Sequence, residues 1–307
     1  MADETQKETK SSKTSAFGVS KRENHDSSQF YDSNLYKSLK KLKKIKYVDN
    51  SKIIPDNVLD HIHLHDSRDM SLIPDESVHL MITSPPYNVT KEYDEDLTLN
   101  EYLELLSKVF KETWRVLVPG GRVAINIANV GRKPYIPLHA YVVNIMDDIG
   151  FHMRGELIWD KGSSAGVSTA WGSFASASDP CLRDVHEYIL IFSKITNKLE
   201  KLDRQSTIEK PDFVEWSKSI WRFSAVSAKK VGHPAPFPEE LPSRLIQFYS
   251  YKGDVILDPF IGSGTTAIAA YNLNRHYIGF DIASEYVDLA KIKLKEIKSK
   301  KKIIDFM

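Results

Sequence analysis

The chain has 307 residues, of which 41% are hydrophobic and 27% charged, and its formal net charge is +1. This composition predicts one substantial globular core, and a cysteine count of 1, at Cys181, excludes an internal disulfide or a multi-cysteine metal site. No window approaches the roughly 18 consecutive apolar residues of a membrane span, and the polar N-terminus lacks the apolar stretch of a signal peptide, so we expect a cytoplasmic protein with no membrane partner.

The first segment, residues 1–30, is rich in Ser, Thr, Lys, Glu and Asp and has few large apolar groups. Such a segment cannot offset the conformational entropy that is lost on ordering. We therefore expect a disordered tail over 1–30 and one folded domain over 31–307.

A short strand is predicted over Val58–His65, where alternation would place His61, His63 and His65 on one face. Three histidines at this spacing could bind a metal. No acid or cysteine is placed by the sequence to complete a ligand shell, so a polar strand face is the preferred interpretation.

Further along, apolar runs alternate with segments of helical period, which predicts a sheet covered by helices on both faces. Pro119-Gly120-Gly121 is expected to stop the first helix and Gly150 the second. The expected strands are 78–83, 123–130, 156–160, 187–192, 255–258 and 277–281, and the expected helices are 99–117, 138–149, 241–249, 265–273 and 284–297.

Two irregular segments interrupt this alternation. Gly162–Pro180 consists almost entirely of small or hydroxylated residues, and Lys194–Gly232 mixes charges with Trp216, Trp221 and Arg222. Long loops inside a compact domain are usually functional or disordered, so both segments are candidate binding regions.

Ser84-Pro85-Pro86-Tyr87 follows the apolar run Val78–Thr83, at a point where a buried strand would end. Open α/β sheets bind their ligands at such strand ends. The four residues offer a hydroxyl, a backbone carbonyl oriented by proline and an aromatic face, a set that suits a flat ring bearing an amino group. An ordinary Pro-Pro loop with a packed tyrosine is the alternative.

A second motif, Asp258–Thr266, predicts a strand, a glycine turn and a helix, the arrangement of a nucleotide pocket. Gly262-x-Gly264-x-x-Ala267 also fits a dinucleotide fingerprint, with Asp281 near the spacing of an acid on ribose hydroxyls. A nicotinamide dehydrogenase is disfavoured because the unit is C-terminal, Asp-Pro-Phe precedes the glycines, and Ser-Pro-Pro-Tyr would be unexplained.

Together the two motifs resemble those of the amino-group DNA methyltransferases. The resemblance extends from about Asp66 to Leu289 and includes His186-Glu187-Tyr188 and His233-Pro-Ala-Pro-Phe-Pro. The order, with the catalytic motif first, is similar to that of the β class of restriction-modification systems. It implies a single S-adenosylmethionine-dependent, Rossmann-like α/β domain with a mixed, mainly parallel sheet, circularly permuted, plus a small irregular target-recognition region.

The resemblance also implies a division of the domain. The catalytic half would span about 58–160, and the cofactor-binding half about 233–298. The target-recognition segments would be about 162–183 and 194–232.

The implied cofactor is S-adenosylmethionine, and no metal is implied. Asp281 would bind the ribose, although family members more often carry Glu there. Asp66 would contact the adenine amino group, and Phe280 and Ile282 would flank the adenine ring. The methionine end would be held by Asp258, Phe260, Gly262, Gly264 and Thr265.

The implied substrate is double-stranded DNA with a specific short recognition sequence. The overall charge is nearly neutral, so the positive charge must be local, and lysine-rich runs occur at 36–47 and 291–302. Such runs are more often solvated helix faces, so they add little support. The resemblance allows a cognate restriction endonuclease in the same system, without direct contact, and either a monomer or a dimer.

The catalytic residues implied by the resemblance are Ser84, Pro85, Pro86 and Tyr87. An exocyclic amino nitrogen is a poor nucleophile because its lone pair is delocalised into the ring. The Ser84 hydroxyl and the Pro85 carbonyl can accept its two N–H bonds, while Tyr87 stacks on a base that has left the duplex. Because Ser84 is a neutral acceptor, by analogy we predict cytosine N4 as the target, with adenine N6 as the alternative.

Three other functions are less favoured. Pro180-Cys181 resembles the nucleophile of cytosine C5 methyltransferases, but in that family the cofactor motif comes early and Ser-Pro-Pro-Tyr is not needed. A non-catalytic DNA-binding relative is disfavoured by the intact residues at both sites. Methylation of RNA or of a protein amide is disfavoured because those enzymes usually carry Asn before the two prolines.

Overall fold

The computed structural model describes residues 33–37, 46–87, 97–131, 133–162, 172–225 and 237–305. The chain divides into two units, Met1–Lys43 and Lys44–Met307, and the described part of the first contains the single helix α2 (Asn34–Lys37). Three sequence predictions lie outside the described residues, namely the disordered tail 1–30, residues 163–171 of the first irregular segment, and residues 226–236 with His233-Pro-Ala-Pro.

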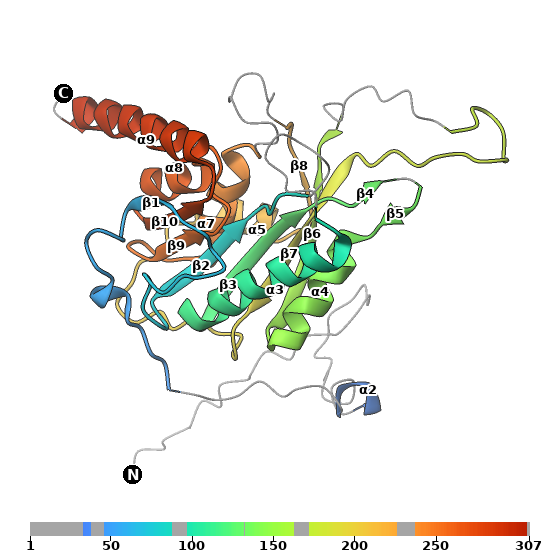
Figure 1. The fold of residues 1–307 in the computed structure, drawn as a ribbon. Helices are drawn as coiled ribbons and strands as arrows, with labels where there is room; N and C mark the ends of the chain where they lie inside the picture. The colour runs from blue at the N-terminus through green and yellow to red at the C-terminus, as the bar shows by residue number, and fades with distance from the viewer. Residues whose placement is uncertain are drawn as a thin grey trace, which may run out of the picture. The chain divides into compact units, whose positions relative to one another are not determined.

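The second unit is built on a mixed sheet whose strands follow the order β1-β10-β9-β2-β3-β7-β6-β8 (Figure 1). The strands from β1 to β3 run parallel, and β7 is antiparallel to both β3 and β6. A two-stranded ribbon, β4 with β5, stands apart from this sheet. The bounds are β1 (His61–Leu64), β2 (Val78–Thr83), β3 (Leu117–Ile127), β4 (Val130–Gly131), β5 (Tyr135–Ile136), β6 (His152–Asp160), β7 (His186–Ser193), β8 (Ile220–Arg222), β9 (Val255–Asp258) and β10 (His276–Asp281).

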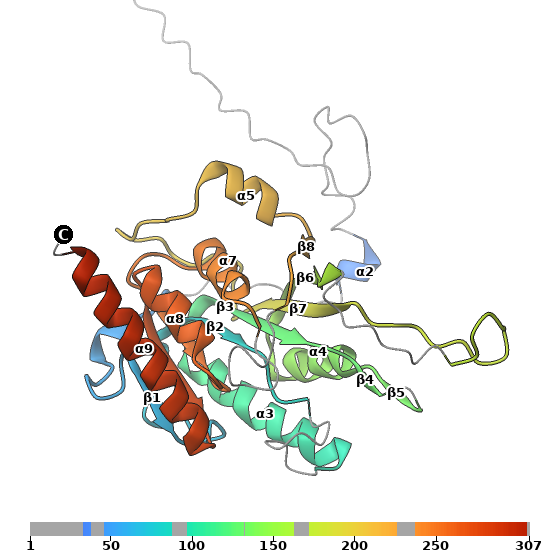
Figure 2. The same cartoon turned by 90° about the horizontal axis from the view of Figure 1, so that it is seen from above.

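Helices cover both faces of the sheet, as the sequence predicted. Figures 1 and 2 show α3 (Leu99–Val116) and α4 (Leu138–Ile149) on one face. The other face carries α7 (Glu240–Tyr249), α8 (Thr265–Asn272) and α9 (Ser284–Asp305). Because both faces are covered, all six residues of β2 are buried, as expected for a central strand of a parallel sheet.

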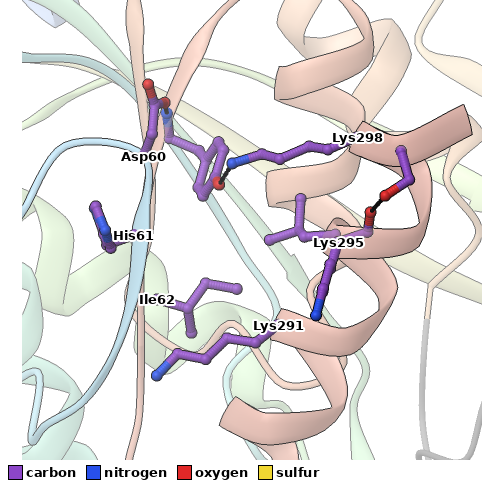
Figure 3. Close-up of a pocket in the computed structure, with 9 residues that line it drawn as sticks. Asp60, His61, Ile62, Lys291, Lys295 and Lys298 are labelled. Carbon is purple, nitrogen blue, oxygen red and sulfur yellow. Dashed lines mark hydrogen bonds between the residues drawn. The ribbon is translucent and has the colours of Figure 1, made fainter. Parts of the chain in front are cut away.

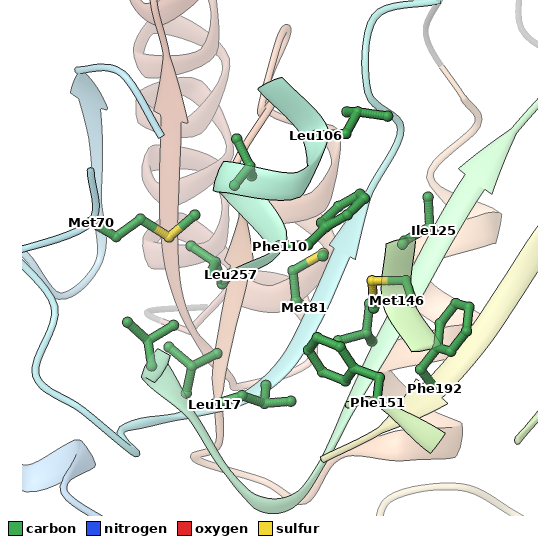
Figure 4. Packing of buried hydrophobic residues seen from close by; sticks show 14 of the residues in the cluster. Met70, Met81, Leu106, Phe110, Leu117, Ile125, Met146, Phe151, Phe192 and Leu257 are labelled. Carbon is green, nitrogen blue, oxygen red and sulfur yellow. The ribbon is translucent and has the colours of Figure 1, made fainter. Parts of the chain in front are cut away.

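The core on the α3 and α4 side is dense and apolar (Figure 4). Leu106 and Phe110 of α3 have no exposed surface and pack in one cluster with Met81 of β2 and Leu257 of β9. Burying each such side chain stabilises the fold by roughly 1.5–3 kcal/mol.

The ends of these two helices follow their sequence signals. At the start of α3, the Thr98 side chain accepts from the Glu101 backbone N–H, and the Glu101 carboxylate accepts from the Thr98 N–H, which completes a capping box. At the end of α4, Gly150 takes a left-handed φ of 112°, as predicted.

The junction between α3 and β3 differs from the prediction. The helix ends at Val116, and β3 begins at once with Leu117 and continues through Pro119-Gly120-Gly121. The register against β2 shifts there, so the Pro-Gly-Gly segment is an irregularity inside a strand. Gly120 needs a φ of 80° and leaves no room for a Cβ, which would lie 2.0 Å from the Lys198 carbonyl oxygen.

Other boundaries also moved. The strand expected from Val58 begins only at His61, because residues 56–60 form a turn, and the strand expected over 156–160 begins already at His152. The C-terminal helix continues to Asp305.

The segment Lys194–Gly232 was predicted to be irregular, and this is wrong for its second half. It contains α5 (Lys210–Trp216) and the edge strand β8, which pairs parallel to β6. Trp221 is 2% exposed, and its Nε1 donates to the Trp216 carbonyl, so it belongs to the core. Among the described residues, no helix has the length and apolar character needed to cross a membrane.

Candidate active site

Two motifs that lie far apart in the chain meet at the carboxyl edge of the sheet. β2 and β9 are parallel neighbours, with Leu80 paired to Ile256. These strands end in Thr83 and Asp258, and Thr83 Oγ1 donates a hydrogen bond of 2.7 Å to Asp258 Oδ1. The bond joins the Ser-Pro-Pro-Tyr loop to the glycine turn, so the prediction that both motifs meet at adjacent strand ends is confirmed.

The Asp258 carboxylate is buried and is surrounded by protein donors. Thr266 Oγ1 donates to its Oδ2 at 2.6 Å, and the Phe260 N–H donates to its Oδ1 at 3.1 Å. The residue is 1% exposed, and burial raises the pKa of Asp258 to about 6. These hydrogen bonds hold the loop between β9 and α8 in place, and the predicted contact of Asp258 with the cofactor stays a prediction.

The glycine turn brings the backbone close to the start of α8. Gly262 and Gly264 have φ values of 47° and 86°, in the left-handed region. Gly264 is the N-cap of α8, and a Cβ there would lie 2.8 Å from the Cβ of Ala290. No side chain of the described residues caps this helix, so its first backbone N–H groups, beginning at the half-buried Thr265, can receive an anionic group.

Asp281 ends β10 beside this turn. Its carboxylate accepts from the Gly262 N–H and the Ala283 N–H, both at 2.9 Å, and burial raises its pKa. A carboxylate has about four acceptor positions, so room for a further donor remains.

The remaining predicted cofactor residues have mixed outcomes. Asp66 follows β1, whose last residue pairs with Asp281, and its carboxylate is held by the Arg68 side chain, whose hydrogen bonds lower the pKa of Asp66. Ile282 is 62% exposed. Phe280 has no exposed surface, because this position of β10 faces the core, so the prediction that Phe280 flanks the adenine ring is wrong.

The Ser-Pro-Pro-Tyr loop is tied to β3 and β7 through polar side chains. Ser84 Oγ and Tyr87 Oη lie 3.1 Å apart, and Tyr87 Oη donates to Glu187 Oε2 at 3.2 Å. Asn126 Nδ2 donates to the same Glu187 oxygen at 2.5 Å and lies 3.3 Å from Tyr87 Oη. Burial and then the charge of Glu187 raise the pKa of Tyr87 well above its usual value.

Lys161 completes this network from the residue after β6. Its Nζ donates to Glu187 Oε1 at 2.5 Å, and the two side chains are only 20% and 13% exposed. Asn126 is 2% exposed, and its Oδ1 has no hydrogen-bond partner among the described residues. An unsatisfied buried acceptor costs about 1–3 kcal/mol, so a ligand donor at this position would be stabilising.

Sequence reasoning missed three members of the site. Thr266 lies in the Asp258–Thr266 motif but was given no role, Asn126 carries no motif that marks it, and Lys161 follows an unremarkable strand. Glu187 was noted within His186-Glu187-Tyr188 but received no role. The hydroxyl next to the predicted Thr265 was the available signal, because a buried aspartate requires donors.

The three histidines lie on β1 and the residue that follows it, with His61 exposed and the other two half-buried. His63 and His65 contact the Phe280 ring, and each of the three rings lies within hydrogen-bond distance of a different backbone carbonyl. The described residues contain no group of three side chains suited to a metal ion.

A hollow of about 370 Å³ lies between β1 and α9 (Figure 3). It is lined by the start of β1 and by Lys291, Lys295 and Lys298, and Lys298 Nζ donates to Tyr277 Oη at 2.9 Å. Its strand residues lie at the amino ends of β1 and β10, opposite the edge that carries the motifs. None of the predicted site residues lines it.

Known proteins are similar to this chain over the region that contains both motifs. A family profile described as DNA methylase matches residues 78–292. The Type II methyltransferase M.MjaI of Methanocaldococcus jannaschii is 34% identical over 285 residues, which cover 78% of this chain and 92% of that protein. The Type II methyltransferase M.BglII of Bacillus subtilis is 31% identical, over 77% of this chain and 69% of that protein.

Solved structures show the same fold. TTHA0409 of Thermus thermophilus aligns with a TM-score of 0.63 at 32% identity, over 77% of this chain and 94% of that one. A structure of TTHA0409 complexed with S-adenosyl-L-methionine aligns with a TM-score of 0.62 at 30% identity. The predicted family and the mixed, mainly parallel α/β fold are thus confirmed, and the chain belongs to the N6/N4 DNA methylase family.

Proposed function

We propose that this DNA methylase modifies the exocyclic N4 of a cytosine that is flipped out of duplex DNA at a specific short sequence. As a family member, it transfers a methyl group from S-adenosylmethionine to an amino group in DNA. The observation that carries the proposal is the 2.7 Å bond between Thr83 and Asp258, which holds the Ser-Pro-Pro-Tyr loop beside the glycine turn. Adenine N6 is the alternative target.

The glycine turn and its surroundings fit S-adenosylmethionine. The uncapped start of α8 suits the carboxylate of the methionine end, and Asp281 retains acceptor positions for ribose hydroxyls. Phe260, Gly262, Gly264 and Thr265 form the turn, and Asp66 lies at the same edge for the adenine amino group. When bound, the cofactor supplies an electrophilic methyl group on a sulfonium.

The catalytic loop presents its polar groups to the target base. Ser84 Oγ and the Pro85 carbonyl accept the two amino N–H bonds, which restores the nitrogen lone pair, while Pro86 restricts the loop. The Tyr87 hydroxyl is anchored to Glu187, so its ring is oriented before the base arrives. Stacking on this ring offsets part of the cost of unstacking, a few kcal/mol.

Alanine substitutions separate the two halves of the site. Ser84→Ala or Tyr87→Ala should abolish turnover and leave cofactor affinity within a few fold, because those residues face the base. Asp258→Ala should weaken cofactor binding, because it releases the glycine turn from Thr83 and Thr266. Calorimetry that shows the same loss of cofactor binding in all three variants would contradict this division.

The target atom rests on Ser84. A carboxylate at this position would accept a strong, charge-assisted hydrogen bond, whereas serine is a neutral acceptor, the residue found mostly with cytosine N4 in this family. Methylated duplex DNA should yield N4-methylcytosine when it is digested to nucleosides and weighed by mass spectrometry. N6-methyladenine as the sole product would overturn the choice.

Sequence readout is assigned to 162–183 and 194–232, although Trp221 is excluded because it is buried. Exchanging 194–232 with the segment of a relative should change the methylated sequence, since base contacts specify and phosphate contacts position. If the methylated sequence stayed the same, residues outside 194–232 would be the ones that read the DNA sequence.

Cys181 is not part of the proposed chemistry. It is half-buried beside the Gly172–Pro180 bridge. Cys181→Ser should keep methylation, and loss of turnover with an intact fold would support a covalent mechanism instead.

We place the enzyme in the cytoplasm, as a monomer or dimer, with a cognate endonuclease in the same system but no direct contact. The circularly permuted motif order and the division into halves at about 58–160 and 233–298 are retained as part of the proposal. The position of β9, from the C-terminal third of the chain, beside β2 supports them.

A further inference from the structure

In the polar network behind the Ser-Pro-Pro-Tyr loop, the hydrogen bonds between side chains all point the same way, with each hydroxyl donating toward Glu187. An ionised carboxylate can only accept hydrogen bonds, so Tyr87 must donate to Glu187. Tyr87 Oη can then only accept from its other neighbours, which are Asn126 Nδ2 at 3.3 Å and Ser84 Oγ at 3.1 Å, so the Ser84 hydroxyl is the donor in its contact with Tyr87. The hydrogen of the Ser84 hydroxyl is thereby committed to Tyr87, and although Asn126 Nδ2 lies 3.5 Å from Ser84 Oγ, the oxygen keeps acceptor capacity for a substrate N–H.

Two side chains hold the Glu187 carboxylate in the position where it accepts from Tyr87. Lys161 Nζ contacts its Oε1 at 2.5 Å, and Asn126 Nδ2 contacts its Oε2 at 2.5 Å. The three side chains come from different parts of the sheet, namely the end of β6, β3 and β7. The Lys161 ammonium also lies over the Trp159 ring at 5.5 Å, which fixes its stem.

We propose that Ser84, Tyr87 and Glu187 form a proton relay, in which Glu187 takes up the proton that the target amino group loses on methylation. This inference rests on the proposed amino-methyltransferase function and assigns a role to Glu187, which touches the base only through the two hydroxyls. Lys161 and Asn126 are positioning residues for its carboxylate.

The step balances in atoms and charge. The nitrogen lone pair forms the new N–C bond, and the electron pair of the broken C–S bond stays on sulfur, which becomes neutral. The nitrogen passes a proton to Ser84 Oγ, Ser84 passes its own to Tyr87 Oη, and Tyr87 passes its own to Glu187 Oε2. The carboxylate ends as a neutral carboxyl group, and the methylated base is uncharged.

The relay changes what Ser84 can do. With its proton committed to Tyr87, Ser84 is an acceptor for the amino N–H and not a donor to the neighbouring ring nitrogen. In Glu187→Gln, Lys161 keeps the amide oxygen on its own side, so the amide NH₂ faces Tyr87 and Asn126, whose own amide turns to offer its unpartnered Oδ1. The hydrogen bonds then reverse, and Ser84 presents a hydrogen to the amino group it should accept from.

The test compares Glu187→Gln and Tyr87→Phe with the wild type in single-turnover methylation of duplex DNA. Each variant should lower the rate constant by about 100-fold, the range of general acid–base catalysis, with cofactor affinity within about threefold. The double variant should be no slower than either single variant, because both cut one chain. Glu156→Gln, at an exposed glutamate of β6, is the matched control and should change nothing.

A readout without turnover uses the protein alone. With ¹³C-labelled tyrosine, the Tyr87 Cζ resonance, assigned by Tyr87→Phe, should shift in Glu187→Gln and stay unchanged in Glu156→Gln, since Cζ reports the hydrogen bonding of the hydroxyl.

Two results would overturn the relay: single-turnover rates within twofold of wild type in both variants, or a double variant whose loss is the product of the single losses. Neither outcome affects the proposed function, because wild-type methyl transfer to cytosine is measured in the same assay. Absence of that wild-type product would refute the proposed function, while the Cζ shift would still report the hydrogen-bond direction.

Discussion

The buried carboxylate of Asp258 makes a specific stability prediction. It is 1% exposed, and its pKa is raised from 3.8 to about 6 by burial. In Asp258→Asn the Thr83 hydroxyl can still donate to Oδ1, and the Thr266 hydroxyl can turn to accept from the new amide NH₂. The substitution therefore removes a buried charge and keeps the hydrogen-bonded geometry.

The sign follows from proton binding. Between about pH 4 and pH 6 the folded protein holds a proton on Asp258 that the unfolded chain has lost, so wild-type stability falls as pH rises through this window. A shift of about two pKa units corresponds to about 3 kcal/mol, at 1.36 kcal/mol per unit, as an upper bound. Asp258→Asn has no group that titrates at this position, so its free energy of unfolding lacks this decrease with pH.

Urea unfolding of both proteins from about pH 4.5 to about pH 8 measures the effect. The stability of Asp258→Asn relative to the wild type should rise with pH by up to about 2 kcal/mol over this range, because the rest of the change lies below about pH 4.5, and level off above about pH 7. A relative stability that stays constant, or falls, across this range would refute the assignment of a raised pKa to Asp258.

Three further predictions use simpler measurements. Gly264→Ala should weaken cofactor binding and destabilise the fold by more than the roughly 1–2 kcal/mol of left-handed strain, because its Cβ meets Ala290. Gly253→Ala, at a φ of 82° with open space around the Cβ, is the control and should lose only the strain energy in urea unfolding. Leu106→Ala should lose about 2–5 kcal/mol, and Leu72→Ala, at a 39% exposed position, much less; equal losses would contradict the described core. DNA affinity should fall linearly on a log–log plot against salt, and a flat response would argue against phosphate contacts.

The strands that carry the motifs were predictable because local signals agree with the tertiary structure. Val78–Thr83 and Val255–Asp258 are short apolar runs closed by proline or glycine, and both have the predicted bounds. Their adjacency followed from the shared position of the motifs at strand ends.

The second half of Lys194–Gly232 could not be predicted from local pattern. β8 has three residues, too few to show a period, and it becomes a strand by pairing with β6. Trp221 is buried because Arg244 lies over its ring at 5.4 Å and the surrounding core closes around it. Such contacts exist only in the folded protein.

The grouping of polar side chains around Glu187 also could not be predicted from the sequence. Asn126, Lys161 and Glu187 meet because β7 lies antiparallel between β3 and β6, which pairs Trp159 with Glu187 and Asn126 with Ile189. No spacing along the chain encodes that register.

The strand order also bears on how the chain is made. β1 and β2 leave the ribosome early, yet β10 and β9, which lie beside them, come last, and Asp60 is joined to Tyr277, 217 positions later. Until residues 255–281 are synthesised, β2 presents an apolar edge with no strand to pair with on that side. Such delayed, long-range pairing slows folding and exposes the nascent chain to aggregation. A chain released before β10 is complete would therefore aggregate instead of yielding a smaller folded enzyme.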